Sequence, residues 1–519
     1  MNVLKLNGND LTLQDLWEVV YERRPVMLAP DARLAVERAR ALVEELVEGG
    51  GVAYAVTTGV GKLADVRIAH DQLRELQVNL VRSHAVGVGA PLPQPETRAM
   101  MLLRANSLAK GHSGVRPVVI DTLCEMLNRG VHPVVPSQGS VGASGDLAPL
   151  AHLALVLIGE GEAVFDKKPM EAAAALKAAA VKPLALEAKE AVSLMNGTQA
   201  MLATGALALL AAETLADSAD VVAALSLDAL KGSIVAFDDR IHRVRPHIGQ
   251  MTSAKNLRRM LEGDDPIRTS HRECGRVQDA YSLRCIPQVH GAVRDTLAHC
   301  RQVFETEINS AVDNPLIFFP PRQVGTPQKP GPQKNEGEIL SGGNFHGQPL
   351  AFAMDFLAIA LAALAGISER RTERMVNPSL SEGLPPFLAP GAGLHSGFMM
   401  AQVTAAALVS ENKVLAHPAS VDSITTSGNK EDYVAMGMTA AIKLMKVVEN
   451  TRRVLAIEAL AAAQAIDFLR PLKSSKRGEQ AYSLIRAAAP AMTHDRSLAP
   501  DFELVASMIA EGKLAAVVR

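Results

Sequence analysis

The chain has 519 residues, of which 53 are basic and 55 acidic, so its formal net charge at pH 7 is −2. A hydrophobic content of 48% and a charged content of 21% are typical of a globular protein. The balanced charge gives no electrostatic reason for binding nucleic acid or an anionic membrane. A chain far above the ~100–200 residues of a single-core domain predicts several structural units or one large helical assembly.

The cysteines and the N-terminal segment indicate a cytoplasmic protein without a metal site. The four cysteines form neither a CxxC pair nor a zinc-like spacing, so we expect reduced and mostly buried thiols. The first residues, MNVLKLNGNDLTLQDL, are polar and lack the apolar core of a signal peptide. The stretch from Leu350 to Ile367 approaches the length of a membrane span. It contains Asp355 and many alanines, so we expect a buried helix there.

The predicted elements are mainly helices, because alanine and leucine dominate and aromatic residues make up only 3% of the chain. Long apolar helical patterns occupy residues 96–110, 198–231, 286–311, 348–375 and 398–416. Between Met438 and Ala465 a further helical face is predicted, formed by Leu444, Val448, Thr451, Leu455, Ala459 and Ala462. These patterns predict long, roughly antiparallel helices.

Glycine and polar residues gather between the predicted helices, where loops commonly carry chemistry. These clusters lie at residues 50–62, 137–146, 193–199, 341–348, 377–397 and 423–432. Residues 320–337, PPRQVGTPQKPGPQKNEG, are predicted to form a flexible surface loop without a catalytic role. We place a domain boundary near residue 200. It separates a loop-rich N-terminal part, residues 1–200, from a long-helix part, residues 201–519.

The loop at 137–146 contains Ala143-Ser144-Gly145, a tripeptide that means little by itself. Its setting, Gly-Ser-Val-Gly-Ala-Ser-Gly-Asp-Leu-Ala-Pro-Leu at residues 139–150, strongly resembles the signature of the histidine and phenylalanine ammonia-lyase family. Further segments that resemble the family follow in its order. They are Tyr54–Gly61, Met195–Thr198, Gln278–Arg284, Asp313–Pro315, Gly342–His346 and Thr426–Asp432.

This resemblance implies a cofactor made from the backbone, 4-methylidene-imidazol-5-one (MIO), and no external cofactor. In the family the glycine amide nitrogen attacks the alanine carbonyl and two waters leave. Glycine offers an unhindered amide, serine supplies the β-hydroxyl that is lost, and alanine is small enough to permit closure. The resemblance also implies a mainly α ammonia-lyase fold, which is fumarase/aspartase-like and has a long central helical bundle. It further implies a homotetramer whose active sites draw residues from more than one subunit.

The matched segments imply roles for individual residues. Tyr54 corresponds to the general base that removes the β-proton, which requires donors or cations close to its oxygen. Tyr281 would assist proton transfer or hold the amine. The guanidinium fork of Arg284 suits bidentate binding of the substrate carboxylate.

Three amides and one aromatic residue complete the implied site. Asn196, Gln278 and Asn314 resemble the amides that hydrogen-bond the MIO ring and the substrate. A purely structural role in loop closure is the alternative for each of them. Phe345 would pack against the substrate ring or fill the core.

Two further positions bear on the substrate. His84, in Ser83-His84, resembles the Ser-His pair of histidine lyases, and Glu431 stands where those lyases carry Glu and the phenylalanine and tyrosine lyases carry Gln. A carboxylate suits the N–H of an imidazole, whereas a phenyl ring would leave it unpaired. The resemblance therefore implies conversion of L-histidine to trans-urocanate and ammonia, the first step of histidine degradation. The sequence departs from the family pattern at Thr57, Val60 and Lys430.

Three alternatives differ in what they require of the sequence. A tyrosine or phenylalanine ammonia-lyase, or an aminomutase, would use the same MIO. A fumarase- or aspartase-type lyase would need a loop resembling Gly-Ser-Ser-x-Met-Pro-x-Lys, which is not present in the sequence. A helical scaffold that had lost catalysis would not need an intact Ala-Ser-Gly together with Tyr54 and Arg284.

Overall fold

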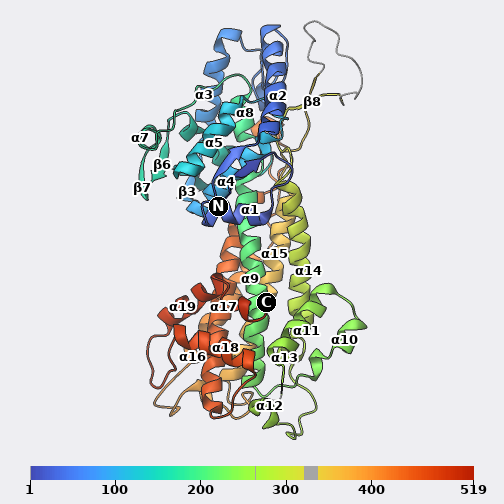
Figure 1. Cartoon of the computed structure of the whole chain (residues 1–519), viewed down its shortest axis with the longest axis vertical. Helices are drawn as coiled ribbons and strands as arrows, with labels where there is room; N and C mark the ends of the chain where they lie inside the picture. Colours follow the sequence, from blue (N-terminus) through green and yellow to red (C-terminus); the bar gives the residue numbers. More distant parts are fainter. Residues whose placement is uncertain (1, 264, 321–336) are drawn as a thin grey trace. The chain divides into compact units, whose positions relative to one another are not determined.

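The computed structural model describes residues 2–263, 265–320 and 337–519. Residues 321–336 of the predicted surface loop therefore lie outside the described residues. The protein is 59% helix and 7% strand, which confirms the mainly α prediction (Figure 1).

The four longest helices each coincide with a predicted apolar pattern. They are α9 (Gln199–Ala229), α14 (Ile286–Glu307), α15 (Gln348–Val376) and α17 (Gly437–Leu469). The face predicted in α17 is buried along its whole length, from Leu444 to Ala462. The two shorter predicted patterns correspond to α4 (Gln94–Ala109) and α16 (Met399–Leu415). The spacing of apolar residues therefore locates these helices to within a few residues.

Two of the long helices are apolar enough to raise the question of a membrane. Among the described residues, α9 and α15 could cross a bilayer by length and composition alone. Within their most apolar windows, 78% of α9 and 61% of α15 are buried inside the structure. The burial of α15 agrees with the expectation of a buried helix for Leu350–Ile367.

The chain forms two compact units, each assembled from three segments. Unit 1 comprises residues 1–207, 302–354 and 419–442. Unit 2 comprises residues 208–301, 355–418 and 443–519. The division at residue 200 stays a prediction about the chain's organisation.

Unit 1 contains all the strands among the described residues, and every strand is short. The parallel pair is β1 (Leu4–Leu6) with β2 (Val26–Leu28). The antiparallel groups are β3 (Val88–Pro91) with β5 (Pro136–Gln138), β4 (His132–Pro133) with β6 (Glu162–Phe165) and β7 (Lys168–Glu171), and β8 (Leu316–Phe318) with β9 (Glu338–Leu340). The remaining helices of this unit are α1 (Leu13–Tyr21), α2 (Pro30–Glu48), α3 (Leu73–His84), α5 (Pro117–Arg129), α6 (Leu147–Leu157), α7 (Ala172–Ala178) and α8 (Glu190–Met195).

Helix α4 lies at the centre of unit 1, where every residue from Glu96 to Ala109 is buried. A helix that is buried on all sides must satisfy its charged side chains internally. Arg98 does so by donating to the backbone carbonyls of Val19 and Val20. Arg104, on the same helix, instead contacts backbone next to the candidate site.

Unit 2 is built from helices around buried ion pairs. The carboxylate of Asp220 accepts from His290 at 2.8 Å and from Arg294 at 2.6 Å. The shorter helices of this unit are α10 (Asp239–Arg243), α11 (Ile248–Met260), α12 (Pro266–Thr269), α13 (Tyr281–Arg284), α18 (Lys476–Ala488) and α19 (Ala499–Ala510). Of the four free cysteines, Cys124 and Cys300 are buried and Cys274 is exposed.

Candidate active site

The Ala-Ser-Gly segment follows β5 and is tied to the turn at residues 196–198. Gly145 and Gly197 form a parallel bridge, and the Asp146 amide donates to the Gly197 carbonyl at 2.7 Å. The Asn196 side-chain amide donates to the Ser144 carbonyl oxygen at 3.0 Å. Two of the predicted site residues are therefore in direct contact.

Gly145 occupies a position that no other residue could fill without a clash. Its φ is +71°, in the left-handed region. A Cβ atom there would lie 2.2 Å from the carbonyl oxygen of Gly197. Close approach of two backbone segments thus explains why the signature needs glycine here, apart from its chemistry.

Asp146 anchors the Ala-Ser-Gly segment that precedes it through hydrogen bonds of its side chain. Its carboxylate accepts from the Ser140 hydroxyl and from the Met201 amide, each at 2.8 Å. The second bond caps the N-terminus of α9, where the helix has unpaired amides. Burial raises the pKa of Asp146 to about 6, although these hydrogen bonds oppose the rise. Asp146 is part of the matched signature, but it is not among the site residues predicted from the sequence.

Glu431 reaches the Ser144 side chain from a distant part of the sequence. Its Oε1 accepts a hydrogen bond from the Ser144 Oγ at 2.7 Å. Its Oε2 accepts from the Thr426 hydroxyl at 2.8 Å, and the Thr426 amide donates to the Glu431 carbonyl at 2.8 Å. Both carboxylate oxygens are therefore engaged, and one of them faces the serine of the candidate cofactor.

Tyr54 lies in a loop that packs against the turn containing Glu431. The Gly61 amide donates to the Tyr54 phenolic oxygen at 3.1 Å, so the oxygen has a backbone donor. A Cβ on Gly428 would lie 3.5 Å from the side-chain stem of Lys62. The tyrosine loop and the Thr426–Glu431 turn are thus neighbours within unit 1.

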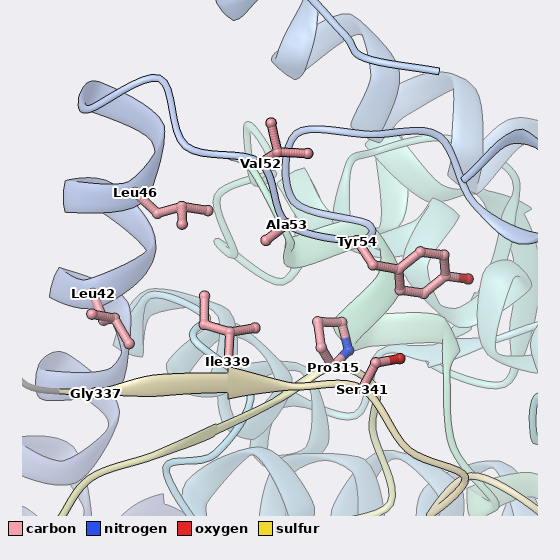
Figure 2. Close-up of a pocket in the computed structure, with 9 residues that line it drawn as sticks. All are labelled: Leu42, Leu46, Val52, Ala53, Tyr54, Pro315, Gly337, Ile339 and Ser341. Carbon is pink, nitrogen blue, oxygen red and sulfur yellow. The ribbon is translucent and has the colours of Figure 1, made fainter. Parts of the chain in front are cut away.

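A cavity of about 430 Å³ opens beside the tyrosine loop (Figure 2). Its lining residues are Leu42, Leu46, Val52, Ala53, Tyr54, Pro315, Gly337, Ile339 and Ser341. Figure 2 shows the oxygen atoms of Tyr54 and Ser341 pointing to the same side, away from Leu42 and Leu46. The cavity is therefore apolar at one end and polar where the tyrosine lies.

Asn314 holds the edge of this cavity. Its side chain donates to the Ser341 hydroxyl at 3.0 Å and accepts from the Gly342 amide at 2.7 Å. The preceding Asp313 accepts from Lys189 at 3.0 Å, and both side chains are at most 1% exposed. Burial raises the pKa of Asp313, but the cations Lys189 and Arg104 outweigh it and lower that pKa below its ordinary value.

Arg104 links this ion pair to the Asn196 turn. Its guanidinium donates to the Asn196 carbonyl at 3.0 Å and to the Gln199 side chain at 2.9 Å, and also to the Ser193 carbonyl. Arg104 and Lys189 are not among the site residues predicted from the sequence. The signal for Arg104 was an arginine inside an otherwise apolar helical run, because such a residue must be paired internally.

His84 and Phe345 each lie beside residues that contact the loop at 137–146. His84 ends α3, with its Nδ1 facing the Leu80 carbonyl at 2.8 Å, and the strand that follows pairs with β5. Phe345 is half-buried and comes two residues before Gly347. The Gly347 amide donates to the Gly142 carbonyl at 3.1 Å.

The other three predicted site residues belong to unit 2. Gln278 is exposed, and the Tyr281 side chain is 70% exposed. The Arg284 guanidinium lies 4.4 Å from the centre of the Tyr281 ring. Among the described residues, the buried Nε of Arg284 has no hydrogen-bond partner. Tyr281 and Arg284 thus form a second group, separate in the chain's organisation from the unit 1 residues.

The departures from the family pattern have different structural settings. The Thr57 hydroxyl donates to the Gly51 carbonyl at 3.0 Å and accepts from the Ala53 amide at 3.1 Å, so it closes the base of the tyrosine loop. Lys430 is exposed and Val60 is half-buried. Only Thr57 has a structural role that these contacts explain.

The residues present fit an MIO group. Ala143 is buried against Val434 and Met436, Gly145 has the required backbone freedom, and Asn196 holds the carbonyl that would become part of the ring. Across residues 2–263, 265–320 and 337–519, no group of three or more His, Cys, Asp or Glu residues could hold a metal ion.

Comparison with known proteins identifies the family. The sequence profile of the family described as aromatic amino acid lyase matches residues 11–487. The chain belongs to this family. A relative, the histidine ammonia-lyase of Koribacter versatilis (strain Ellin345), is 67% identical over 519 residues, which span the whole of both chains. Membership of the aromatic amino acid lyases confirms the resemblance and makes the protein a carbon–nitrogen lyase.

Solved structures of the same family share the fold. The crystal structure of histidine ammonia-lyase from Trypanosoma cruzi is 42% identical, with a TM-score of 0.89 and coverage of 100% of this chain and 95% of that one. The tyrosine aminomutase from Streptomyces globisporus is 39% identical, with a TM-score of 0.91 and coverage of 100% and 98%. These similarities confirm the ammonia-lyase fold, and they include enzymes named for different substrates.

Proposed function

We propose that this aromatic amino acid lyase is a cytoplasmic histidine ammonia-lyase that converts L-histidine to trans-urocanate and ammonia. The observation that carries the proposal is Glu431, whose carboxylate lies 2.7 Å from the Ser144 hydroxyl. An imidazole N–H needs an acceptor at this place, and a carboxylate accepts a charge-assisted hydrogen bond. The similarity to the Koribacter versatilis histidine ammonia-lyase along the whole chain supports the same substrate.

The catalytic electrophile is proposed to be MIO, formed from Ala143, Ser144 and Gly145 without an external cofactor. When formed, it supplies an electrophilic carbon for the substrate amine, which no side chain can provide. Asn196 donates to the Ser144 carbonyl oxygen at 3.0 Å and would stabilise negative charge on it. Asn314 would keep the Ser341–Gly342 edge in place or bind the substrate directly.

Side chains around the proposed MIO would provide acid–base catalysis and position the substrate. Tyr54 would remove the β-proton, and the Gly61 amide at 3.1 Å would stabilise its phenolate. Glu431 and His84 would contact the substrate ring, and Phe345 would pack against it. Holding the reacting atoms in this way replaces a bimolecular encounter with a pre-arranged one.

Carboxylate binding is proposed to come from another subunit of a homotetramer. Arg284 would bind the substrate carboxylate, Tyr281 would assist proton transfer and Gln278 would donate an amide hydrogen bond. The exposure of this segment supports a subunit contact, since Tyr281 is 70% exposed and Val277 is 97% exposed. A tetramer, and loss of activity on dissociation, are the expected results of sedimentation and dilution assays.

Incubation of the purified protein with histidine, tyrosine and phenylalanine separately tests the proposal. Formation of urocanate from histidine, with little product from the other two, is the expected result. Conversion of tyrosine but not histidine would contradict the choice of substrate and favour the alternative of a tyrosine lyase or aminomutase. The intact mass should be lower than the sequence mass by two waters.

A serine variant tests the cofactor separately. Ser144→Ala cannot lose a side-chain hydroxyl, so we expect it to fold, to form no methylidene and to have no measurable turnover. Circular dichroism and the intact mass provide the controls. Turnover near the wild-type rate in this variant would contradict the assignment of the electrophile.

A further inference from the structure

The hydrogen bond between Ser144 and Glu431 involves the oxygen that must leave when the cofactor forms. The Ser144 Oγ donates to Oε1 of Glu431 at 2.7 Å. Thr426 holds the other carboxylate oxygen at 2.8 Å and fixes the orientation of the carboxyl group. If Glu431 only recognised a substrate ring, it would not need to reach the serine of the unreacted chain.

We propose that Glu431 is the proton donor that removes the Ser144 hydroxyl while the cofactor is being made. This inference rests on the proposed function, because it presumes that the Ala-Ser-Gly segment cyclises. A separation of 2.7 Å is within hydrogen-bond reach, so a proton can pass between the two oxygens. Glu431 would therefore act twice, first on the protein's own backbone segment and later on the substrate.

The elimination balances without any oxidant or reductant. The Cα–H and Cβ–Oγ bonds of Ser144 break, and the Cα–H electron pair becomes the second bond between Cα and Cβ. The Cβ–Oγ pair leaves with the oxygen, which takes a proton from the Glu431 carboxyl group and departs as water. The Cα proton passes to solvent. The Glu431 carboxylate, which accepts the Ser144 hydrogen bond before the reaction, takes up the proton from solvent before it donates it, and it is a carboxylate again when the water has left.

Other polar groups near the segment are already engaged elsewhere. The Asp146 carboxylate accepts from Ser140 and from the Met201 amide. Asn196 contacts the Ser144 carbonyl rather than its hydroxyl. Among the described residues, Glu431 provides the hydrogen-bond partner recorded for the Ser144 Oγ. Position and chemistry therefore select Glu431 for this step.

The order of events follows from the same contact. Before dehydration, Oε1 of Glu431 is occupied by the serine hydroxyl. Once that oxygen has left as water, Oε1 becomes free to accept the N–H of an imidazole. Completion of the cofactor thus also frees the oxygen that would accept the hydrogen bond from the substrate ring.

The experiment follows cofactor formation by mass rather than by activity. The full chain is made by cell-free synthesis, and its intact mass is recorded over time for the wild type, for Glu431→Gln and for Asp432→Asn. Asp432→Asn is the matched control, because it removes one exposed carboxylate from the neighbouring position. Thermal melting of each protein confirms that the chains have folded.

We expect the wild type and Asp432→Asn to lose two waters at the same rate. Glu431→Gln should be slower on the order of 10²-fold or more, as for removal of a general acid, and should accumulate a species short of the full loss. Glu431→Asp and Glu431→Ala supplied with formate should recover part of the rate, since each restores a carboxyl group. This recovery would not occur if Glu431 were needed only for folding.

Each other outcome has a distinct meaning. Loss of two waters from Glu431→Gln at the wild-type rate would overturn the inference and leave the proposed function intact. A slow Glu431→Gln that formate and Glu431→Asp both fail to improve would also overturn it. A wild-type chain that loses no water would overturn the inference together with the proposed cofactor.

Discussion

Replacement of Asn196 by alanine isolates one hydrogen bond to the Ser144 carbonyl. The Asn196 side chain is 6% exposed, and its Nδ2 lies 3.0 Å from that oxygen. Its Oδ1 has no hydrogen-bond partner among the described residues, so the substitution breaks no other side-chain hydrogen bond. The backbone stays in place, because Arg104 binds the Asn196 carbonyl at 3.0 Å independently of the side chain.

The expected loss follows from the location of that bond. Removing one buried donor that faces developing negative charge lowers kcat by about 10²–10³-fold, or about 2.7–4 kcal/mol. Asn196→Ala should therefore lose this much kcat for histidine while KM changes little. Asn196→Asp, which keeps the size but places an acceptor there, should lose at least as much.

Two measurements make this prediction decisive. Urocanate formation gives kcat and KM, and intact mass shows whether two waters have been lost. If Asn196→Ala has the mature mass and a kcat near that of the wild type, the amide does not stabilise charge at the Ser144 oxygen. The reasoning from its position would then be refuted.

Three further predictions concern separate residues. Tyr54→Phe should lower kcat on the order of 10²–10⁴-fold and still bind substrate. Kinetics and product-inhibition titrations would measure both effects, and a retained kcat would mean that another group is the base. In Glu431→Gln protein that has formed its cofactor, kcat/KM should fall more for histidine than for phenylalanine, because a neutral amide accepts a weaker hydrogen bond than a carboxylate. If the ratio of kcat/KM for histidine to kcat/KM for phenylalanine equals that of the wild type, Glu431 does not recognise the ring. Burial raises the pKa of Asp228 to about 7 from its ordinary 3.8, so between these values the folded state keeps a proton that the unfolded chain has released, and the wild type loses stability as the pH rises from 3.8 to about 7. Asp228→Asn, which does not titrate, should therefore gain in melting temperature relative to the wild type over this pH range, and a constant difference would contradict the shift.

The long helices and the family signature of the central segment could both be recognised in the sequence alone. Both are local properties: apolar spacing selects a helix, as in α17, and the residues from Gly139 to Leu150 form one uninterrupted signature. The candidate base Tyr54 and the acceptor Glu431 were also found in the sequence, because each lies in a short matched segment. Their residue types suggested roles, but no distances.

Which of these residues meet depends on tertiary packing. Ser144 and Glu431 are 287 positions apart, and nothing local to either indicates that their oxygens lie 2.7 Å from each other. Lys189 and Asp313, 124 positions apart, became a buried pair for the same reason. Such contacts depend on how helices and loops from distant segments pack, since burial forces polar groups to find partners wherever the fold places them. The sequence therefore supplied the reacting groups, and the packing of unit 1 decided which carboxylate faces the serine.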